Sequence, residues 1–156
     1  MDVKYKEAET INDFVDAIRL RVDVFILEQG CKPGWEPDKD DKHSKHFIAI
    51  KDGAVVATAR YREVSKSEIK IERMVTKKEY RNKGVGRGLL QFMIKYIMKQ
   101  KPRKIILQSQ VQARKFYEEC GFKTTSKPFD LYGIQHIDME YIVNSLKKHR
   151  KSTLKN

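Results

Sequence analysis

Residues 81–88, Arg-Asn-Lys-Gly-Val-Gly-Arg-Gly, place three glycines at alternate positions between a strand-like apolar segment and a long amphipathic helical pattern. The glycines let the backbone approach a ligand that any Cβ would obstruct. The helix that follows directs its unpaired N–H groups and the positive end of its dipole to the same point. We call this segment the anion loop, because it is typical of a phosphate-binding turn. Taken alone, it fits a glycine-rich turn with solvated basic side chains equally well.

The length of 156 residues predicts one domain that buries a core of its own. We expect residues 1–146 to form this domain and the basic residues 147–156 to form a flexible tail. Cys31 and Cys120 match no metal-ligand spacing, and no apolar run has the length of a signal peptide or a membrane span. The sequence therefore predicts a reduced, cytoplasmic protein with no metal and no membrane partner.

The formal net charge of +12 suits a nucleic-acid ligand, an anionic cofactor or a lysine-rich surface. Much of the excess lies in the C-terminal tail and on polar helix faces. The sequence contains no pattern of a recognition helix, a zinc finger or an aromatic RNA-binding strand. Nucleic-acid binding is therefore disfavoured as the main activity, although contact of the anion loop with a phosphate backbone stays open as an alternative.

Hydrophobic periodicity predicts an α/β chain with the order β-α-β-β-β-α-β-α-β. The strands are expected at residues 3–8, 46–50, 54–61, 68–76, 104–108 and 136–141, with an Asp52-Gly53 turn between the second and the third. The helices are expected at residues 11–26, 84–99 and 111–120, the first capped by Thr10 or Asn12. Residues 30–41 hold two prolines and four carboxylates, and they predict a long acidic loop.

The fourth expected strand, residues 68–76, delivers the chain to the anion loop. Strict alternation places one mostly apolar set of side chains on one face and a mixed set on the other. The apolar set is Ile69, Ile71, Arg73 and Val75, and the mixed set is Glu68, Lys70, Glu72 and Met74.

Two separated motifs resemble the GNAT superfamily of acyl-CoA N-acyltransferases. The cofactor motif Arg-x-x-Gly-x-Gly is matched by residues 81–86, after a strand and before a helix. The second motif is matched by residues 110–122, with Gln110 in the usual place of Asn. Segments 20–29, 36–46 and 128–139 are similar to the ElaA/YjcF-like subgroup, and the resemblance covers residues 3–141.

The resemblance implies the GNAT fold, an α/β (α+β) arrangement with a central, mixed, mostly antiparallel sheet. Six to seven strands are expected, splayed at the cofactor strand and flanked by helices. The implied co-substrate is acetyl-CoA, and the implied chemistry needs no metal. The residues implied to bind the cofactor are Met74, Val75, Thr76, Arg81, Asn82, Lys83, Gly84, Val85, Gly86, Arg87, Gly88, Gln110, Ala113 and Phe116.

Tyr117 corresponds to the general acid of the family, which protonates the departing thiolate of CoA. A tyrosine with an ordinary pKa of about 10 holds its proton at neutral pH. The attacking amine must lose a proton, and Glu72 is our first candidate for the base, with His136 next and Glu28 on the substrate side. The bland alternatives are core packing for Tyr117, a cross-strand pair for Glu72 and a packed ring for His136, with ordered water as the base.

The acidic loop is the expected source of acceptor selectivity. Asp41 and its neighbouring carboxylates would attract a cationic amine, whereas Arg21, at the end of the first helix, would bind a substrate carboxylate. A solvated charged loop is the alternative for most of these groups.

These residues predict an N-acetyltransferase that transfers an acetyl group from acetyl-CoA to a primary amine of a small molecule or peptide by direct attack in a ternary complex. Neither cysteine is placed as a nucleophile. Transfer of another acyl group, transfer to a protein lysine or N-terminus, and a non-catalytic acyl-CoA-binding module stay open. A homodimer is also compatible with the sequence.

Overall fold

The computed structural model describes residues 1–143, which form two compact units, residues 1–102 and residues from 103 onward. Each unit is described by itself. The expected tail at residues 147–156 lies outside the described residues, and the extent of the domain stays a prediction.

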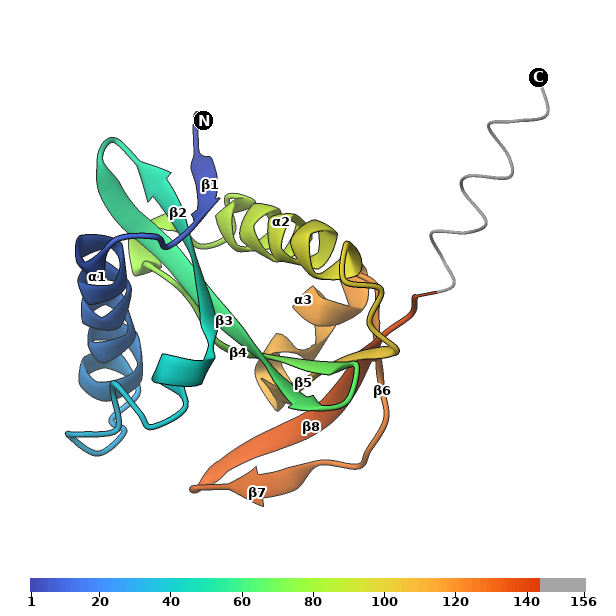
Figure 1. The fold of residues 1–156 in the computed structure, drawn as a ribbon. Coiled ribbons are helices and arrows are strands. Elements are labelled where there is room, and N and C mark those ends of the chain that lie inside the picture. The colour runs from blue at the N-terminus through green and yellow to red at the C-terminus, as the bar shows by residue number, and fades with distance from the viewer. Residues whose placement is uncertain (144–156) are drawn as a thin grey trace. The chain divides into compact units, whose positions relative to one another are not determined.

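The first unit is an antiparallel sheet with a helix on each side (Figure 1). Its strands are β1 (Lys4–Glu7), β2 (Lys45–Lys51), β3 (Ala54–Ser65) and β4 (Glu68–Thr76), and they lie in the order β1-β2-β3-β4. Its helical segments are α1 (Ile11–Arg21), the π-helix η1 (Val22–Glu28), the short 3₁₀ segments η2 (Asp41–His43) and η3 (Lys78–Tyr80), and α2 (Val85–Met98).

Local sequence signals set several of these boundaries. Thr10 and Asp13 form a reciprocal capping box at the start of α1, as one of the two expected caps predicts. Asp52 and Gly53 both have positive φ, 49° and 77°, and make the tight turn between β2 and β3. The expected first helix continues beyond Arg21 as a seven-residue π-helix, which helical periodicity alone did not indicate.

A β-bulge interrupts the pairing of β3 with β4. Thr58 pairs with Val75 and Arg60 pairs with Glu72, so one residue of β3 lies opposite two residues of β4. Arg73 lies in the bulge with a φ of 55°, in the left-handed region that residues with a Cβ seldom adopt.

The bulge changes which face of the sheet the following residues share. Ile71 pairs with Tyr61, whose ring lies 6.4 Å from that of Tyr96 on α2. Val75, beyond the bulge, packs with Leu20 and Val24 of α1 and η1. The prediction that Val75 shares a face with Ile71 is therefore wrong, because the extra residue reverses the alternation.

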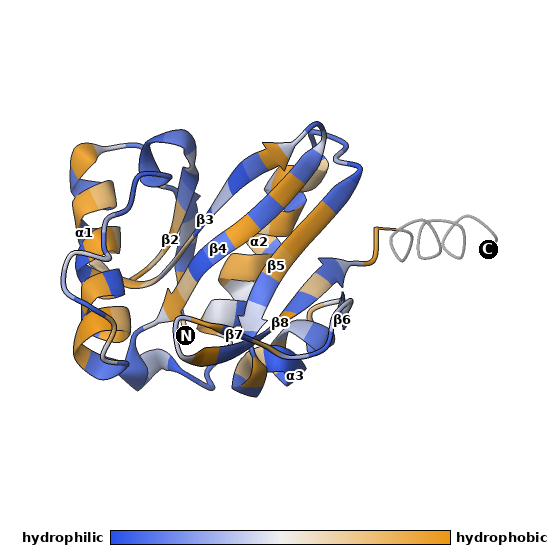
Figure 2. Ribbon diagram, turned by 90° about the horizontal axis from the view of Figure 1, so that it is seen from below, coloured by the Kyte–Doolittle hydropathy of each residue, from blue (hydrophilic) through white to orange (hydrophobic). Residues whose placement is uncertain are grey.

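The core between the sheet and α2 is aromatic and aliphatic. Phe47 is fully buried, and its ring contacts those of Tyr61, Phe92 and Tyr96. Figure 2 shows hydrophobic and hydrophilic residues alternating along β4. Successive side chains of a strand point to opposite faces of the sheet, so β4 contributes to both faces.

The second unit is also antiparallel. It contains β5 (Lys104–Gln110), the 3₁₀ segment η4 (Val111–Ala113), α3 (Arg114–Glu119), β6 (Phe122–Thr124), β7 (Phe129–Leu131) and β8 (Ile134–Tyr141). Both β5 and β6 pair with β8, and β7 forms a hairpin with it. Neither β6 nor β7 is among the strands expected from alternation, since three residues are too few to display it. Among the described residues, no helix is both long and apolar enough to cross a membrane.

Candidate active site

The anion loop has the backbone that its glycines predict. Gly84 precedes α2 with a φ of 81°, and Asn82 has a φ of 59°. The first intrahelical bond runs from the Gly88 amide to the Gly84 carbonyl, at 3.0 Å. Because first-turn amides precede the start of the helical ladder, the amides of Val85 and Gly86 are oriented to receive an anion.

Two of the glycines have different physical reasons to be there. A Cβ on Gly84 would meet no heavy atom within 4 Å, but the positive φ favours glycine. A Cβ on Gly88 would lie 2.1 Å from the hydroxyl oxygen of Tyr5. The absence of a side chain at Gly88 therefore allows Tyr5 of β1 to pack against α2. This packing role is independent of any contact of Gly88 with a ligand.

Arg81 joins three segments of the first unit. Its Nε donates to the carbonyl of Thr76 at 2.9 Å, and its two terminal nitrogens donate to the carboxylate of Glu28 at 2.6 and 2.9 Å. The hydrogen bond from Arg81 lowers the pKa of Glu28. Lys83 lies over the ring of Tyr80, with its Nζ 5.9 Å from the ring centroid. Arg81 and Lys83 are thus already engaged within the chain.

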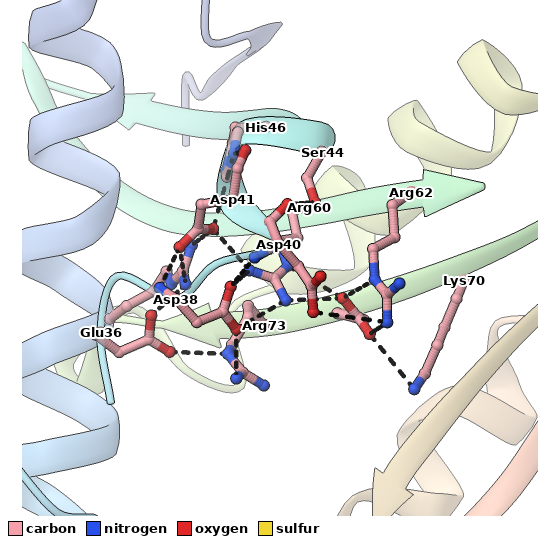
Figure 3. A network of polar contacts seen from close by, with 12 residues as sticks. Glu36, Asp38, Asp40, Asp41, Ser44, His46, Arg60, Arg62, Lys70 and Arg73 are labelled. Carbon is pink, nitrogen blue, oxygen red and sulfur yellow. Dashed lines mark hydrogen bonds and ion pairs between the residues drawn. The ribbon is translucent and has the colours of Figure 1, made fainter. Parts of the chain in front are cut away.

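A buried charge network lies between α1, the acidic loop and the bulged pair of strands (Figure 3). Its two central cations, Arg21 and Arg60, are each only 1% exposed. Asp41 accepts from Arg21 at 2.7 and 3.0 Å and from Arg60 at 2.7 Å. The remaining members are Glu36, Asp38, Asp40, Arg62, Lys70, Glu72 and Arg73.

Glu72 is enclosed by cations. Its carboxylate accepts from Arg60 at 2.8 and 3.1 Å and from Arg62 at 3.0 and 3.1 Å, with Lys70 at 3.4 Å. Burial would raise the pKa of Glu72, but the bonds from Arg62 and the charge of Arg60 outweigh it, so this pKa lies below its ordinary value. A carboxylate so stabilised accepts a proton poorly, and the expected cross-strand pair describes it better than the expected base does.

The acidic loop uses its charges within the chain. Burial raises the pKa of Asp41, but its bonds from Arg21 and Arg60 bring that pKa down to about 2. Glu36 accepts from Arg21 and lies 2.9 Å from Arg73. Arg21 and Asp41, expected as alternative contacts for an anionic and for a cationic substrate group, thus bind each other, and neither presents an uncompensated charge to a ligand.

The second unit holds the other predicted residues. Tyr117 lies on α3, its ring in edge contact with Phe116 and Phe122 at 5.0 and 6.0 Å between centroids. Burial, with a smaller effect of Cys120, raises the pKa of the Tyr117 phenol. Gln110 precedes η4, which ends at Ala113.

His136 has a defined tautomer. Its Nδ1 lies 2.8 Å from the carbonyl of Ile134 and must donate, because a carbonyl only accepts. In the neutral ring the lone pair therefore resides on Nε2. The ring is stacked on Phe129, with 6.3 Å between centroids.

Sequence reasoning did not identify the arginines that neutralise the acidic loop. Arg60 and Arg62 alternate along β3, and both bond Glu72. An available signal was the hairpin register, which places Arg60 opposite Glu72 and Arg62 opposite Lys70, so that Arg62 reaches Glu72 diagonally on the same face. Arg73 gave no such signal, since its role depends on the bulge.

Comparison with known proteins gives the family. The model of the acetyltransferase (GNAT) domain matches residues 12–143. The chain is 35% identical over 142 residues to a candidate acetyltransferase of Bacillus subtilis (strain 168), covering 89% of this chain and 95% of the relative. It is 30% identical over 125 residues to the uncharacterised N-acetyltransferase YjcF of the same organism, covering 80% and 89%.

Solved structures agree in fold. Escherichia coli ElaA superposes with a TM-score of 0.81 at 23% identity, covering 90% of this chain and all of ElaA. A streptothricin acetyltransferase candidate of Bacillus anthracis, solved with acetyl coenzyme A, superposes with a TM-score of 0.57 at 23% identity, over 64% of this chain and 62% of that one. With the glycine loop before α2 and the second motif on α3, these matches show that the chain is an acyltransferase of the GNAT family, similar to ElaA and YjcF.

Proposed function

We propose that this protein transfers an acetyl group from acetyl-CoA to a primary amine, by direct attack while both substrates are bound. The observation that carries the proposal is the anion loop, where the left-handed Gly84 precedes α2, and where the bulged strand β4 leads the chain through η3. A pyrophosphate fits such a helix N-terminus, because the amides and the dipole both favour negative charge.

The residues present suit the parts of the cofactor. The space beside Gly84 is open, so a phosphate can approach the backbone there. We propose that residues 81–87 hold the pyrophosphate and that the main chain of residues 74–76 holds the pantetheine amides. The resemblance also supports a contact of Gln110, Ala113 and Phe116 with acetyl-CoA, and we propose these three residues as cofactor-binding.

In the proposed reaction the amine nitrogen forms a bond to the thioester carbonyl carbon, and the bond from carbon to sulfur breaks. The amine loses a proton to a base, and the CoA thiolate gains one from the Tyr117 hydroxyl. Because burial raises the pKa of Tyr117, the hydroxyl is protonated at neutral pH.

For the base we now favour His136 over Glu72. The donation from Nδ1 to the Ile134 carbonyl leaves Nε2 as a proton acceptor. Glu72 is held as an anion by Arg60 and Arg62 and is a weaker acceptor. Cys31 and Cys120 are not joined by a disulfide bond, in keeping with the proposed cytoplasmic location.

The test is mass spectrometry of a panel of amines and peptides incubated with the protein and acetyl-CoA, together with calorimetric titration of acetyl-CoA. We expect one acetyl group on an acceptor amine and one free CoA thiol for each turnover. Tyr117→Phe should lower kcat about 100-fold or more and leave the Kd for acetyl-CoA within about twofold. Tyr132→Phe, on an exposed tyrosine, is the matched control. Tight binding of acetyl-CoA without transfer to any acceptor would instead indicate a binding module.

A further inference from the structure

The left-handed conformation of Arg73 needs a physical cause. Glycine adopts a φ of 55° freely, whereas a residue with a Cβ is strained there, and β4 nevertheless carries an arginine. Such a conformation persists only where surrounding contacts stabilise it.

The side chain of Arg73 supplies those contacts. Its Nε lies 2.9 Å from Glu36 Oε1, and its Nη2 donates to Asp38 Oδ2 at 2.8 Å. Its guanidinium carbon also lies 6.0 Å from the ring centroid of Phe25 on η1. The guanidinium therefore joins the bulge to the acidic loop and the π-helix, as Figure 3 shows for the two carboxylates.

The carboxylates that hold Arg73 are themselves fixed. Glu36 accepts from the buried Arg21, and Asp38 accepts from the buried Arg60 at 2.6 and 3.0 Å. Each carboxylate is thus shared between a buried arginine and Arg73. A link fixed at both ends resists displacement of the bulge more than a solvent-exposed ion pair does.

The bulge decides how the strand continues. It reverses the side-chain alternation, so that Val75 joins the face of Glu72, and it sets the direction of the peptide groups that follow Arg73. These are the peptide groups of residues 74–76, to which the proposed function assigns the pantetheine arm.

We propose that Arg73 is a positioning residue, held by Glu36 and Asp38, that keeps the bulge of β4 in the conformation in which the main chain of residues 74–76 binds acyl-CoA. The acidic loop, in this view, acts on the cofactor strand through Arg73. The cofactor part rests on the proposed function, whereas the restraint on the bulge does not.

The experiment separates the side chain from the backbone. Arg73→Gly removes the ion pairs but suits the left-handed backbone, and Arg73→Lys retains one charge without the two-pronged fork. Asp38→Asn weakens the same link from the loop, and Arg19→Ala, which removes an exposed ion pair of α1, is the matched control. Calorimetry gives the Kd for acetyl-CoA, thermal unfolding reports folding, and hydrogen exchange is followed at the amides of residues 74–76.

We expect Arg73→Gly and Asp38→Asn each to raise the Kd about tenfold and to speed exchange at residues 74–76, while the folded fraction stays above about 95%. The double variant should lose little more than the worse single variant, and Arg73→Lys should recover part of the loss. Unchanged Kd and unchanged exchange in folded variants, or fully additive losses in the double variant, would overturn the proposal. If the native protein binds no acetyl-CoA, the proposed function fails, and unchanged exchange alone then overturns the restraint on the bulge.

Discussion

Arg81 and Glu28 form a two-pronged ion pair, with nitrogen to oxygen distances of 2.6 and 2.9 Å, that joins the anion loop to the last residue of η1. The cation at the head of the proposed pyrophosphate site therefore already has an anionic partner within the chain. A phosphate that approaches the loop meets the charges of both residues.

Glu28→Gln should strengthen anion binding, because it removes a negative charge beside the loop and leaves Arg81 in place. We expect the Kd for acetyl-CoA to fall about two- to threefold at low salt, with a smaller gain at high salt. Both side chains are more than a third exposed, so the free energy of unfolding should change by less than about 1 kcal/mol. Calorimetry at two salt concentrations measures this, and weaker binding in Glu28→Gln would contradict it.

Gly84→Ala should mainly weaken the binding of acetyl-CoA, whereas Gly88→Ala should mainly lower the stability of the fold. Alanine at position 84 must adopt a φ of 81°, which should cost about 1 kcal/mol of stability and raise the Kd for acetyl-CoA about tenfold. Alanine at position 88 would collide with Tyr5, so its main effect should be on unfolding. Denaturant titration and calorimetry on the same two variants distinguish the effects, and equal losses of affinity at equal stability would refute the distinction.

Glu72→Gln distinguishes a stabilising role of Glu72 in the charge network from a role as the catalytic base. Removing this anion leaves Arg60 buried without one of its partners, and we expect a loss of about 3 kcal/mol in the free energy of unfolding. The kcat of the folded fraction should fall by less than about tenfold, because Glu72 is not the proposed base. Steady-state rates and urea unfolding decide the matter. A fall of kcat beyond about 100-fold with full stability would restore Glu72 as the base.

Low pH should reduce the free energy of unfolding of the first unit, because Asp41 becomes protonated. Its pKa in the folded protein is about 2, below the ordinary value of 3.8, so its stabilising effect is complete above the ordinary pKa and disappears as the pH falls toward 2. The effect corresponds to about 2 kcal/mol. Asp38 and Glu72 shift the same way, whereas burial raises the pKa of Glu36 and opposes them at neutral pH.

Urea unfolding between pH 2 and pH 7 measures this dependence. Asp41→Asn should be less stable at neutral pH and should show a flatter acid dependence than the native chain. Asp52→Asn, at the exposed turn between β2 and β3, should leave the profile unchanged. An acid dependence equally steep in Asp41→Asn would exclude Asp41 as its source.

Much of the fold could be predicted because its signals are local. The Asp52-Gly53 turn, the Thr10 cap and the glycine before α2 each depend on a few adjacent residues. The family followed from two short motifs for the same reason. The site residues carried over from those motifs stay predictions.

The remaining features depend on contacts between distant residues. Asp41 and Arg60 are 19 positions apart, and nothing near either one reveals that they pair. The bulge at Arg73 could not be predicted from the alternation of apolar and polar residues, because that pattern assumes that each residue pairs with one residue of the next strand. The sequence therefore predicts either acceptor selectivity or a solvated surface for the acidic loop, whereas Glu36, Asp38 and Asp41 lie inside a network of arginines.

The edge position of β1 has a consequence for how the protein behaves at high concentration. This strand pairs with β2 on one side, and its sequence alternates Lys4 and Lys6 with Tyr5 and Glu7. A second chain that added a strand in register there would bring lysines of both molecules close together. The first strand thus discourages edge-to-edge aggregation, and replacing Lys4 and Lys6 with threonine would remove that protection.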